Sequence, residues 1–234
     1  MTTDLFGEAV PPSRGSDRPI RGEPVPPLVP AAAAIHTVLC GEAPGRWGAD
    51  ASGVPFLGDV AGTHLMRALI AAGAATWPGP PESMRWDGTQ LAAARITPIV
   101  MGVMLTNAFD RCPADPRVPG RTKIRPPTPG ELRATENLVR LRAELALAHG
   151  RGLRQVVTMG RVAEAVLAPL VGELDGVALI PLPHPSAQGL LTAAPRLIAG
   201  APAGGKGCTL AALAAAWEAA LARAVARGAG RGAP

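Results

Sequence analysis

Residues 35–45 of the 234-residue chain read IHTVLCGEAPG, a run of β-branched and apolar residues that ends abruptly at a glycine. The run predicts a buried strand over 35–40, because such side chains fit an enclosed, pleated surface. Similar runs follow at 99–105, 153–159 and 177–182, and segments with helical spacing separate them. Strands that alternate with helices predict an α/β fold, a three-layer α/β/α sandwich with a central four-stranded parallel sheet.

Helices are expected between and after these strands. In residues 62–73 the apolar side chains recur at helical spacing, and the final Gly73 suits a helix end. Residues 128–131, TPGE, have the form of a capping box with proline at the first helical position. They predict a helix from 128 to about 149. Two more helices are predicted over 161–167 and 209–226.

The remaining segments indicate one domain with two tails. Residues 1–33 hold seven of the 26 prolines, which predicts a disordered or loosely packed N-terminal tail. We expect one domain over 34–227 and a flexible C-terminal tail over 228–234. No run approaches about 18 apolar residues, and the N-terminus lacks the features of a secretory signal, so no membrane association is expected.

Charge and cysteine content narrow the class of protein. The net charge is +5, from 23 basic and 18 acidic residues, which permits a polyanionic partner without establishing one. The three cysteines, Cys40, Cys112 and Cys208, are too few and too scattered for a disulfide framework, so a reducing cytosol is expected. No cluster of histidines, cysteines or carboxylates has metal-ligand spacing, and neither a metal nor another cofactor is predicted.

The unusual polar segments all follow predicted strands. They span residues 41–58, 107–127 and 184–191. Because ligands bind beyond the carboxyl ends of parallel strands, these loops are expected to meet at one sheet edge and form a site. The segment Gly200–Lys206 has the spacing of a phosphate-binding loop, but Gly207 stands where that loop needs serine or threonine. This difference argues against a nucleotide hydrolase.

Four residues in these loops carry useful chemistry, and each has a structural alternative. Glu42, at a strand end, suits a general base or a cation stabiliser, or it caps backbone amides. Phe56, in a glycine-rich loop, would stack on a flat ligand or fill the core. The Asn107 amide has the donor and acceptor that read a base edge, or it ends a turn. His184 lies between prolines that aim its imidazole, or it is structural.

Taken in order, the motifs resemble those of the uracil-DNA glycosylase superfamily, in particular its families four and five. The resemblance covers roughly residues 35–195. The spacing from the first motif to Asp59 resembles that of family five. The matching segments are GEAPG at 41–45, the Gly53, Phe56, Gly58 and Asp59 spacing, LTN at 105–107 with RCP at 111–113, MGRVA at 159–163 and HPS at 184–186.

The resemblance implies a monofunctional DNA glycosylase that acts on uracil-containing DNA. It would hydrolyse the N-glycosidic bond of uracil, and of other deaminated bases, in a flipped-out nucleotide and so initiate base excision repair. We expect a monomer in the cytoplasm, at the bacterial nucleoid. The alternative is a catalytically weak protein that binds uracil-containing or damaged DNA.

The expected roles follow from this chemistry and from the resemblance. Glu42 would orient a water or stabilise a cationic sugar, and His184 would donate to the developing uracil oxyanion. The family-five spacing makes Asp59 a second candidate for the catalytic carboxylate. Asp50 is a lesser candidate. Base contacts are expected from Gly41, Ala43, Phe56 and Asn107. DNA contacts are expected from Pro185, Ser186, Gln188, Leu190, Arg121, Lys123 and Arg125. The gap left by the flipped base would be filled by Gln188, Leu190 or Leu191.

The sequence departs from these families in three places. Three cysteines cannot supply the four thiolates of the iron–sulfur cluster that family four carries, so no cluster is predicted. Arg125 stands where a related branch has the histidine that traps DNA covalently, so no such trapping is expected. The chain has no tyrosine, so the tyrosine that excludes thymine in another family has no counterpart, and looser base selectivity is expected.

Overall fold

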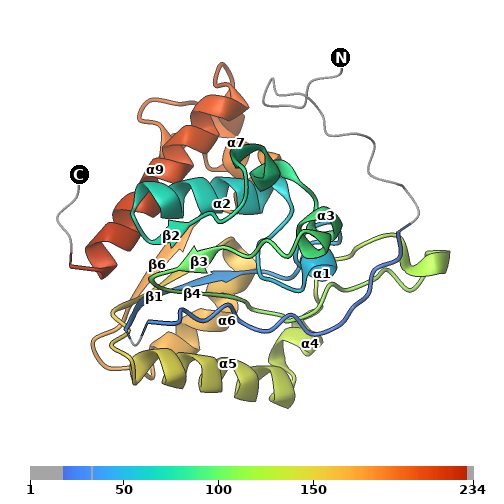
Figure 1. The fold of residues 1–234 in the computed structure, drawn as a ribbon. Coiled ribbons are helices and arrows are strands. Elements are labelled where there is room, and N and C mark those ends of the chain that lie inside the picture. The colour runs from blue at the N-terminus through green and yellow to red at the C-terminus, as the bar shows by residue number, and fades with distance from the viewer. Residues whose placement is uncertain (1–17, 33, 231–234) are drawn as a thin grey trace.

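The computed structural model describes residues 18–32 and 34–230, and its centre is a single parallel sheet (Figure 1). The strands are β1 (Ile35–Gly41), β4 (Gly102–Asn107), β5 (Gln155–Met159) and β6 (Ala178–Leu182). They lie in the order β4-β1-β5-β6, and every neighbouring pair is parallel. The predicted α/β fold with a central four-stranded parallel sheet is confirmed.

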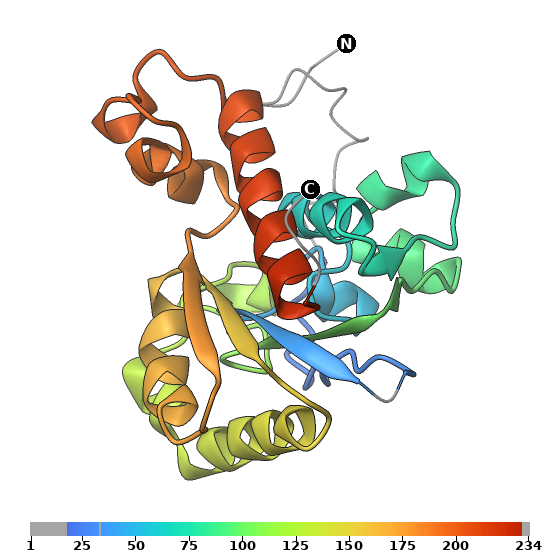
Figure 2. The same ribbon diagram turned by 90° about the vertical axis from the view of Figure 1, so that its left-hand side faces the viewer.

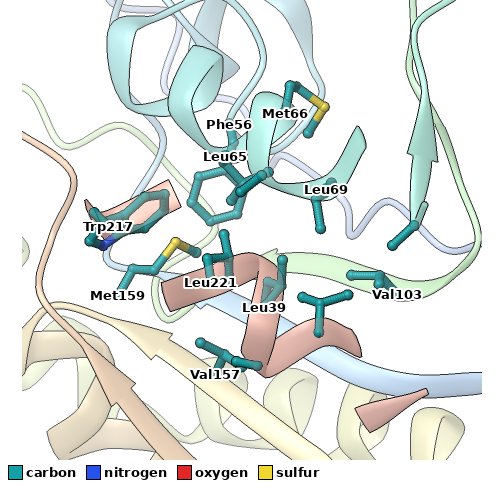
Figure 3. Close-up of a cluster of buried hydrophobic side chains, with 14 of the residues drawn as sticks. Leu39, Phe56, Leu65, Met66, Leu69, Val103, Val157, Met159, Trp217 and Leu221 are labelled. Atoms are coloured by element: carbon teal, nitrogen blue, oxygen red, sulfur yellow. The ribbon is translucent and has the colours of Figure 1, made fainter. Parts of the chain in front are cut away.

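Helices cover both faces of this sheet, which completes the three predicted layers (Figure 2). Helices α2 (Val60–Ala71) and α9 (Leu210–Gly228) lie on one face, and α5 (Thr135–His149) and α6 (Arg161–Val171) lie on the other. Two clusters of buried apolar side chains fill the spaces between the layers. The cluster beneath α2 and α9 includes the fully buried Trp217 (Figure 3).

The register of the strands brings their carboxyl ends level. Gly41 pairs with Asn107 across β1 and β4, and Met159 pairs with Leu182 across β5 and β6. The segments that follow the four strands therefore leave the sheet at one edge. Between β1 and β5 the chain changes direction across the sheet, which is where open parallel sheets bind their ligands.

The strand predicted over 99–105 is interrupted. It forms β3 (Ile99–Val100) and then β4, because Gly102 has a φ of +70° and breaks the extended backbone. The short β3 pairs with β2 (Ala75–Thr76) in a separate antiparallel sheet. The apolar run therefore contributes one strand to each of two sheets instead of one strand to a single sheet.

The helix predicted from residue 128 is also divided. Its capping box forms as expected, with the Thr128 side chain accepting from the backbone of Glu131 and the Glu131 side chain accepting from the backbone of Thr128. The first helix, α4 (Pro129–Arg133), ends at Ala134, whose ψ of 139° is not helical, and α5 begins directly afterwards.

Several short elements complete the described residues. The segment Gly200–Lys206 follows a helix, not a strand, so it lacks the strand–loop–helix context of a phosphate-binding loop. No helix within 18–32 or 34–230 is long and apolar enough to cross a membrane. The short elements are α1 (Ala49–Ser52), α3 (Gly88–Ala93), α7 (Ala187–Thr192), α8 (Ala194–Leu197), η1 (Pro81–Arg85), η2 (Pro119–Arg121) and η3 (Ala203–Gly205).

Residues 18–32 differ from the loose tail expected there. Ile20 and Val25 are buried, and the backbone of Leu28 exchanges two hydrogen bonds with that of Leu105 in β4. The buried Asp50 accepts from the backbone N–H groups of this segment at 2.8 and 2.9 Å. A distant carboxylate and the edge of β4 thus hold the segment on the domain. The rest of the expected N-terminal tail, and residues 231–234, lie outside the described residues.

Candidate active site

A cavity of about 490 Å³ lies at the carboxyl ends of the strands. It is lined by residues from loops far apart in the sequence, including Glu42 after β1, Asn107 at the end of β4 and His184 after β6. The structure therefore brings the four residues with distinctive chemistry to one cavity. Its other walls include Ala43, Phe56, Asp59, Ile124, Arg125, Ser186 and Gln188.

Gly41, Phe56 and Asn107 are packed so closely that the first must be glycine. A Cβ on Gly41 would lie 2.6 Å from Cε1 of Phe56 and 2.9 Å from Oδ1 of Asn107. Phe56 has a φ of +61°, a strained conformation for an aromatic residue. Its ring lies beside Leu65 in the buried cluster (Figure 3). Phe56 thus packs on the core and also lines the cavity. Its position is compatible with both roles considered for it, stacking on a ligand and filling the core.

The Asn107 side chain is buried but its amide is not fully used. Its Nδ2 has no hydrogen-bond partner among the described residues. The backbone beneath it is fixed, because Nη2 of Arg140 donates to the Asn107 carbonyl at 3.0 Å. Arg140 also pairs with Glu144 at 2.6 Å and donates to Asn137 at 2.9 Å. A buried amide that is held rigidly but left unpaired is available to a ligand.

Sequence reasoning missed this polar network beneath Asn107. Asn137, Arg140 and Glu144 lie on α5 at helical spacing, next to the buried Leu141 and Leu145. The Thr106 hydroxyl also donates to Glu144, at 2.6 Å. Charged residues on the apolar stripe of a helix are the signal that could have identified the network, because such groups are buried only when they are paired.

The two candidate carboxylates differ in how they are engaged. Glu42 is half-buried, and its carboxylate makes no hydrogen bond or ion pair with any residue that the structure describes; its carbonyl accepts from Phe109 at 2.9 Å. Asp59 begins α2 and accepts from the Gly62 N–H at 2.7 Å. A Cβ on Gly48 would lie 2.6 Å from its other carboxylate oxygen. Asp59 therefore has a structural task, whereas Glu42 is free to meet a ligand.

The His184 imidazole is oriented by its own loop. The Ser186 N–H donates to Nδ1 at 3.2 Å, so the proton of a neutral ring lies on Nε2. Gly189 lets the loop turn tightly, since a Cβ there would lie 2.2 Å from the His184 carbonyl oxygen. The preceding Pro183 is tied to α9, because its carbonyl accepts from Nε1 of Trp217 at 2.8 Å. The ring thus presents an N–H donor from a fixed position.

Two of the residues expected to contact DNA after His184 are buried in this structure. Leu190 is fully buried among the core side chains, and Pro185 is also buried. The turn into α7 directs Leu190 inward, a rotation that the linear motif did not reveal. Ser186 caps α7 by accepting from Gly189 at 3.2 Å, and Gln188 is exposed where it lines the cavity.

The segment Asp110–Pro127, here called the basic loop, has two of its cations in ion pairs, one within the loop and one with α4. Arg117 pairs with Asp115 at 3.0 Å, and Arg125 pairs with Glu131 at 2.6 Å. The Arg125 guanidinium and the Thr128 groups lower the pKa of Glu131 to about 2. Two further cations of the basic loop are placed differently. Arg121 donates to the carbonyl of Arg21 at 3.2 Å, and Lys123 is exposed to solvent.

The cysteines do not form a cluster site. Cys40 lies in β1 and Cys112 in the basic loop, and both are buried, while Cys208 precedes α9. Burial raises the pKa of Cys40 well above its usual range and that of Cys112 to about 12, so both stay as neutral thiols. Cluster iron binds thiolates, and these residues do not fit that chemistry.

Comparison with known proteins agrees with this arrangement. The model of the family described as the uracil DNA glycosylase superfamily matches residues 29–196. The chain is 37% identical over 160 residues to a protein named type-5 uracil-DNA glycosylase from Thermus thermophilus. That match covers 66% of this chain and 61% of the relative, so the chain spans about three-fifths of the relative's length. The matched region contains every cavity residue named above, and the chain belongs to the uracil DNA glycosylase superfamily.

Proposed function

We propose that the protein excises uracil from DNA by hydrolysing the N-glycosidic bond of a nucleotide turned out of the base stack. The observation that carries the proposal is the single cavity shared by Glu42, Phe56, Asn107 and His184. Its volume of about 490 Å³ suits a small flat ligand. A base inside a duplex is hidden from solvent, so the nucleotide must leave the stack before it can enter such a cavity.

Recognition of the base rests on Asn107 and Phe56. The unpaired Nδ2 of Asn107 would donate to a carbonyl oxygen of uracil, and Oδ1 would accept from the ring N–H. This pattern suits a base edge with a carbonyl beside an N–H. The strained backbone of Phe56 holds an aromatic ring at the cavity, where it would stack on the base.

Bond cleavage rests on His184 and Glu42. As the bond from the sugar to N1 breaks, its electron pair moves onto the uracil and positive charge develops on the sugar. The Nε2–H of His184 would donate to the uracil oxygen that gains charge. The free carboxylate of Glu42 would stabilise the cationic sugar and accept a proton from the water that adds to it. Asp59, which caps α2, would assist from the cavity wall.

DNA would be held from outside the cavity. Ser186 and Gln188 line it, and the exposed Lys123 lies in the basic loop beside it. Cations at this position would meet backbone phosphates. One chain supplies every group that the reaction needs, so a monomer suffices.

The test is incubation with a labelled oligonucleotide that holds one uracil, followed by hot alkali. Excision leaves an abasic site, and alkali then cuts the strand at that position. We expect cleavage of the uracil strand and none of a matched strand with cytosine at that position. A uracil strand that is bound but stays intact would contradict the proposal and favour a protein that recognises uracil-containing DNA without turnover.

A further inference from the structure

The side chain that fills the gap left by an extruded base needs a new assignment. Turning a nucleotide out of a duplex leaves a gap, and proteins that unstack DNA commonly insert an apolar side chain into it. The sequence predicts Gln188, Leu190 or Leu191 in this role; Leu190 is fully buried, and Leu191 packs against the same core. Leu191 is only partly buried, but neither leucine lines the cavity.

We infer that Ile124 of the basic loop is this wedge, an inference that rests on the proposed function. The described residues include seven large apolar side chains that are exposed, and Ile124, at 51%, is the one that also lines the cavity. Isolated exposed apolar residues are ordinary on protein surfaces. Ile124 differs because it is both exposed and part of the cavity wall, which places it where the cavity meets solvent.

The backbone around Ile124 is held in a fixed position. Ile124 forms an antiparallel bridge with Ala114. On either side of it, the Asp115 N–H donates to the carbonyl of Lys123 at 2.8 Å and the Arg125 N–H donates to that of Pro113 at 3.0 Å. The wedge therefore stands on a two-stranded ribbon, and little conformational entropy is lost when DNA contacts it.

The ribbon is also tied to the rest of the domain at both ends. The Ile20 N–H donates to the carbonyl of Arg121 at 2.9 Å, and Arg46 donates to that of Thr122. After Ile124, the Arg125 guanidinium makes two hydrogen bonds to the Glu131 carboxylate, at 2.6 and 2.7 Å. These contacts hold the apolar side chain of Ile124 in solvent. In a less constrained loop, the same side chain would turn inward.

The charges beside Ile124 suit a side chain that enters DNA. Lys123 precedes it and is exposed, and Arg125 follows it and lines the cavity. An apolar residue next to an exposed cation can enter the base stack while Lys123 lies near a phosphate, whereas the charge of Arg125 is already paired with Glu131. Gln188 is the competing candidate, since it is exposed at the same cavity but is polar.

The test compares excision from single-stranded and duplex DNA, because only a duplex needs a side chain to hold its stack open. Single-turnover rates are measured for Ile124→Ala, for the conservative Ile124→Leu and for Gln188→Ala. The matched control is Ile99→Ala, which removes the same atoms from an isoleucine that is 57% exposed on β3 and does not line the cavity. Both isoleucines are exposed, so folding is retained.

We expect Ile124→Ala to lower excision from duplex DNA about 10-fold and to change excision from single strands less than about twofold. Ile124→Leu should recover most of the duplex rate, and Ile99→Ala should match the wild type on both substrates. The wedge assignment is wrong if Ile124→Ala lowers both rates equally or neither, or if Gln188→Ala alone causes the duplex-specific loss.

A second measurement separates this inference from the proposed function. The fluorescence of 2-aminopurine beside a uracil nucleotide rises when the stack opens, and it reports binding without turnover. If the wild type excises from neither substrate, the proposed function fails, and this signal alone decides the role of Ile124. A rise in the wild type that Ile124→Ala abolishes supports the wedge; an equal rise in both proteins overturns it.

Discussion

The strand ends and the basic loop line the same cavity, but their polar groups are partnered in opposite ways. At the strand ends, the Glu42 carboxylate and Nδ2 of Asn107 make no hydrogen bond with any residue of the described chain. In the basic loop, Arg117 and Arg125 each make an ion pair within a few residues. The strand ends therefore present polar groups without partners, whereas these two cations of the basic loop are paired with nearby carboxylates.

This difference separates groups that react from groups that hold a shape. An unpaired polar group in a partly buried site costs free energy unless a ligand completes its hydrogen bonds. Ion pairs in a loop instead fix its backbone, as the Arg125–Glu131 pair does beside Ile124. Substitutions at the strand ends should therefore act on the chemistry, and those in the basic loop on stability and DNA binding.

The largest effect is expected from the strand ends. His184→Ala and Glu42→Gln should each slow single-turnover excision of uracil by about a hundredfold or more, since each removes a group that acts on developing charge. Their urea unfolding midpoints should stay close to that of the wild type, because neither side chain supports the core.

Asp59→Asn provides the matched control for Glu42→Gln. Asparagine can still cap α2, so its fold is retained and only the second carboxylate is lost. We expect a smaller loss of rate than for Glu42→Gln. A larger loss would assign the main catalytic charge to Asp59.

The next effect concerns the network beneath Asn107. Arg140→Met leaves Glu144, whose side chain is 8% exposed, without its cation, so the free energy of unfolding should fall by about 3 kcal/mol. Excision should fall as well, because Arg140 holds the Asn107 carbonyl. Chemical denaturation measures the first effect and single-turnover kinetics the second.

Two variants control this prediction. Arg142→Met breaks an ion pair with Glu173 that is half-exposed on both sides, and it should cost about 1 kcal/mol or less. The double variant Arg140→Met with Glu144→Leu should recover much of the stability, because no unpaired charge remains. Equal losses for Arg140→Met and Arg142→Met would show that the buried network has no special role.

A smaller effect is expected from acid. Because Arg125 lowers the pKa of Glu131 to about 2 from its ordinary 4.5, the ionised carboxylate stabilises the folded state above pH 4.5. This contribution is lost as the pH falls from 4.5 towards 2. Glu131→Gln should flatten the dependence of the urea midpoint on pH within that window. A curve that keeps the wild-type slope would contradict the pairing.

The smallest effect is expected from one exposed cation. Lys123→Gln should weaken DNA binding modestly and lower the slope of log affinity against log salt by about 1. Arg117→Gln is the matched control, because Asp115 already occupies that guanidinium. If both variants change the slope equally, ion pairing within the loop does not decide which cations meet phosphate.

The sequence predicts the fold well because the relevant signals are local. Apolar runs identify the four strands, and the TPGE segment identifies the start of a helix. The motifs also predict that Glu42, Phe56, Asn107 and His184 meet at the strand ends, since parallel strands share one edge. Their roles in the reaction remain predictions until the variants are measured.

The features that were not predicted depend on contacts between distant segments. Leu190 is buried because α7 turns its side chain onto the core. The order of residues in the motif does not reveal this orientation. Residues 18–32 are held by Asp50 and by β4, and neither lies near them in the sequence. Gly102 divides a continuous apolar run, and the first part then pairs with the distant β2.

The most direct test of the central claim is a crystal structure of the protein with free uracil. The claim is that the open groups at the strand ends are reserved for one pyrimidine. We expect uracil in the cavity, with Nδ2 of Asn107 donating to one carbonyl oxygen, Nε2 of His184 within hydrogen-bond distance of the other, and the Phe56 ring stacked on its face. Uracil bound elsewhere, with the Asn107 amide still unpaired, would contradict the account.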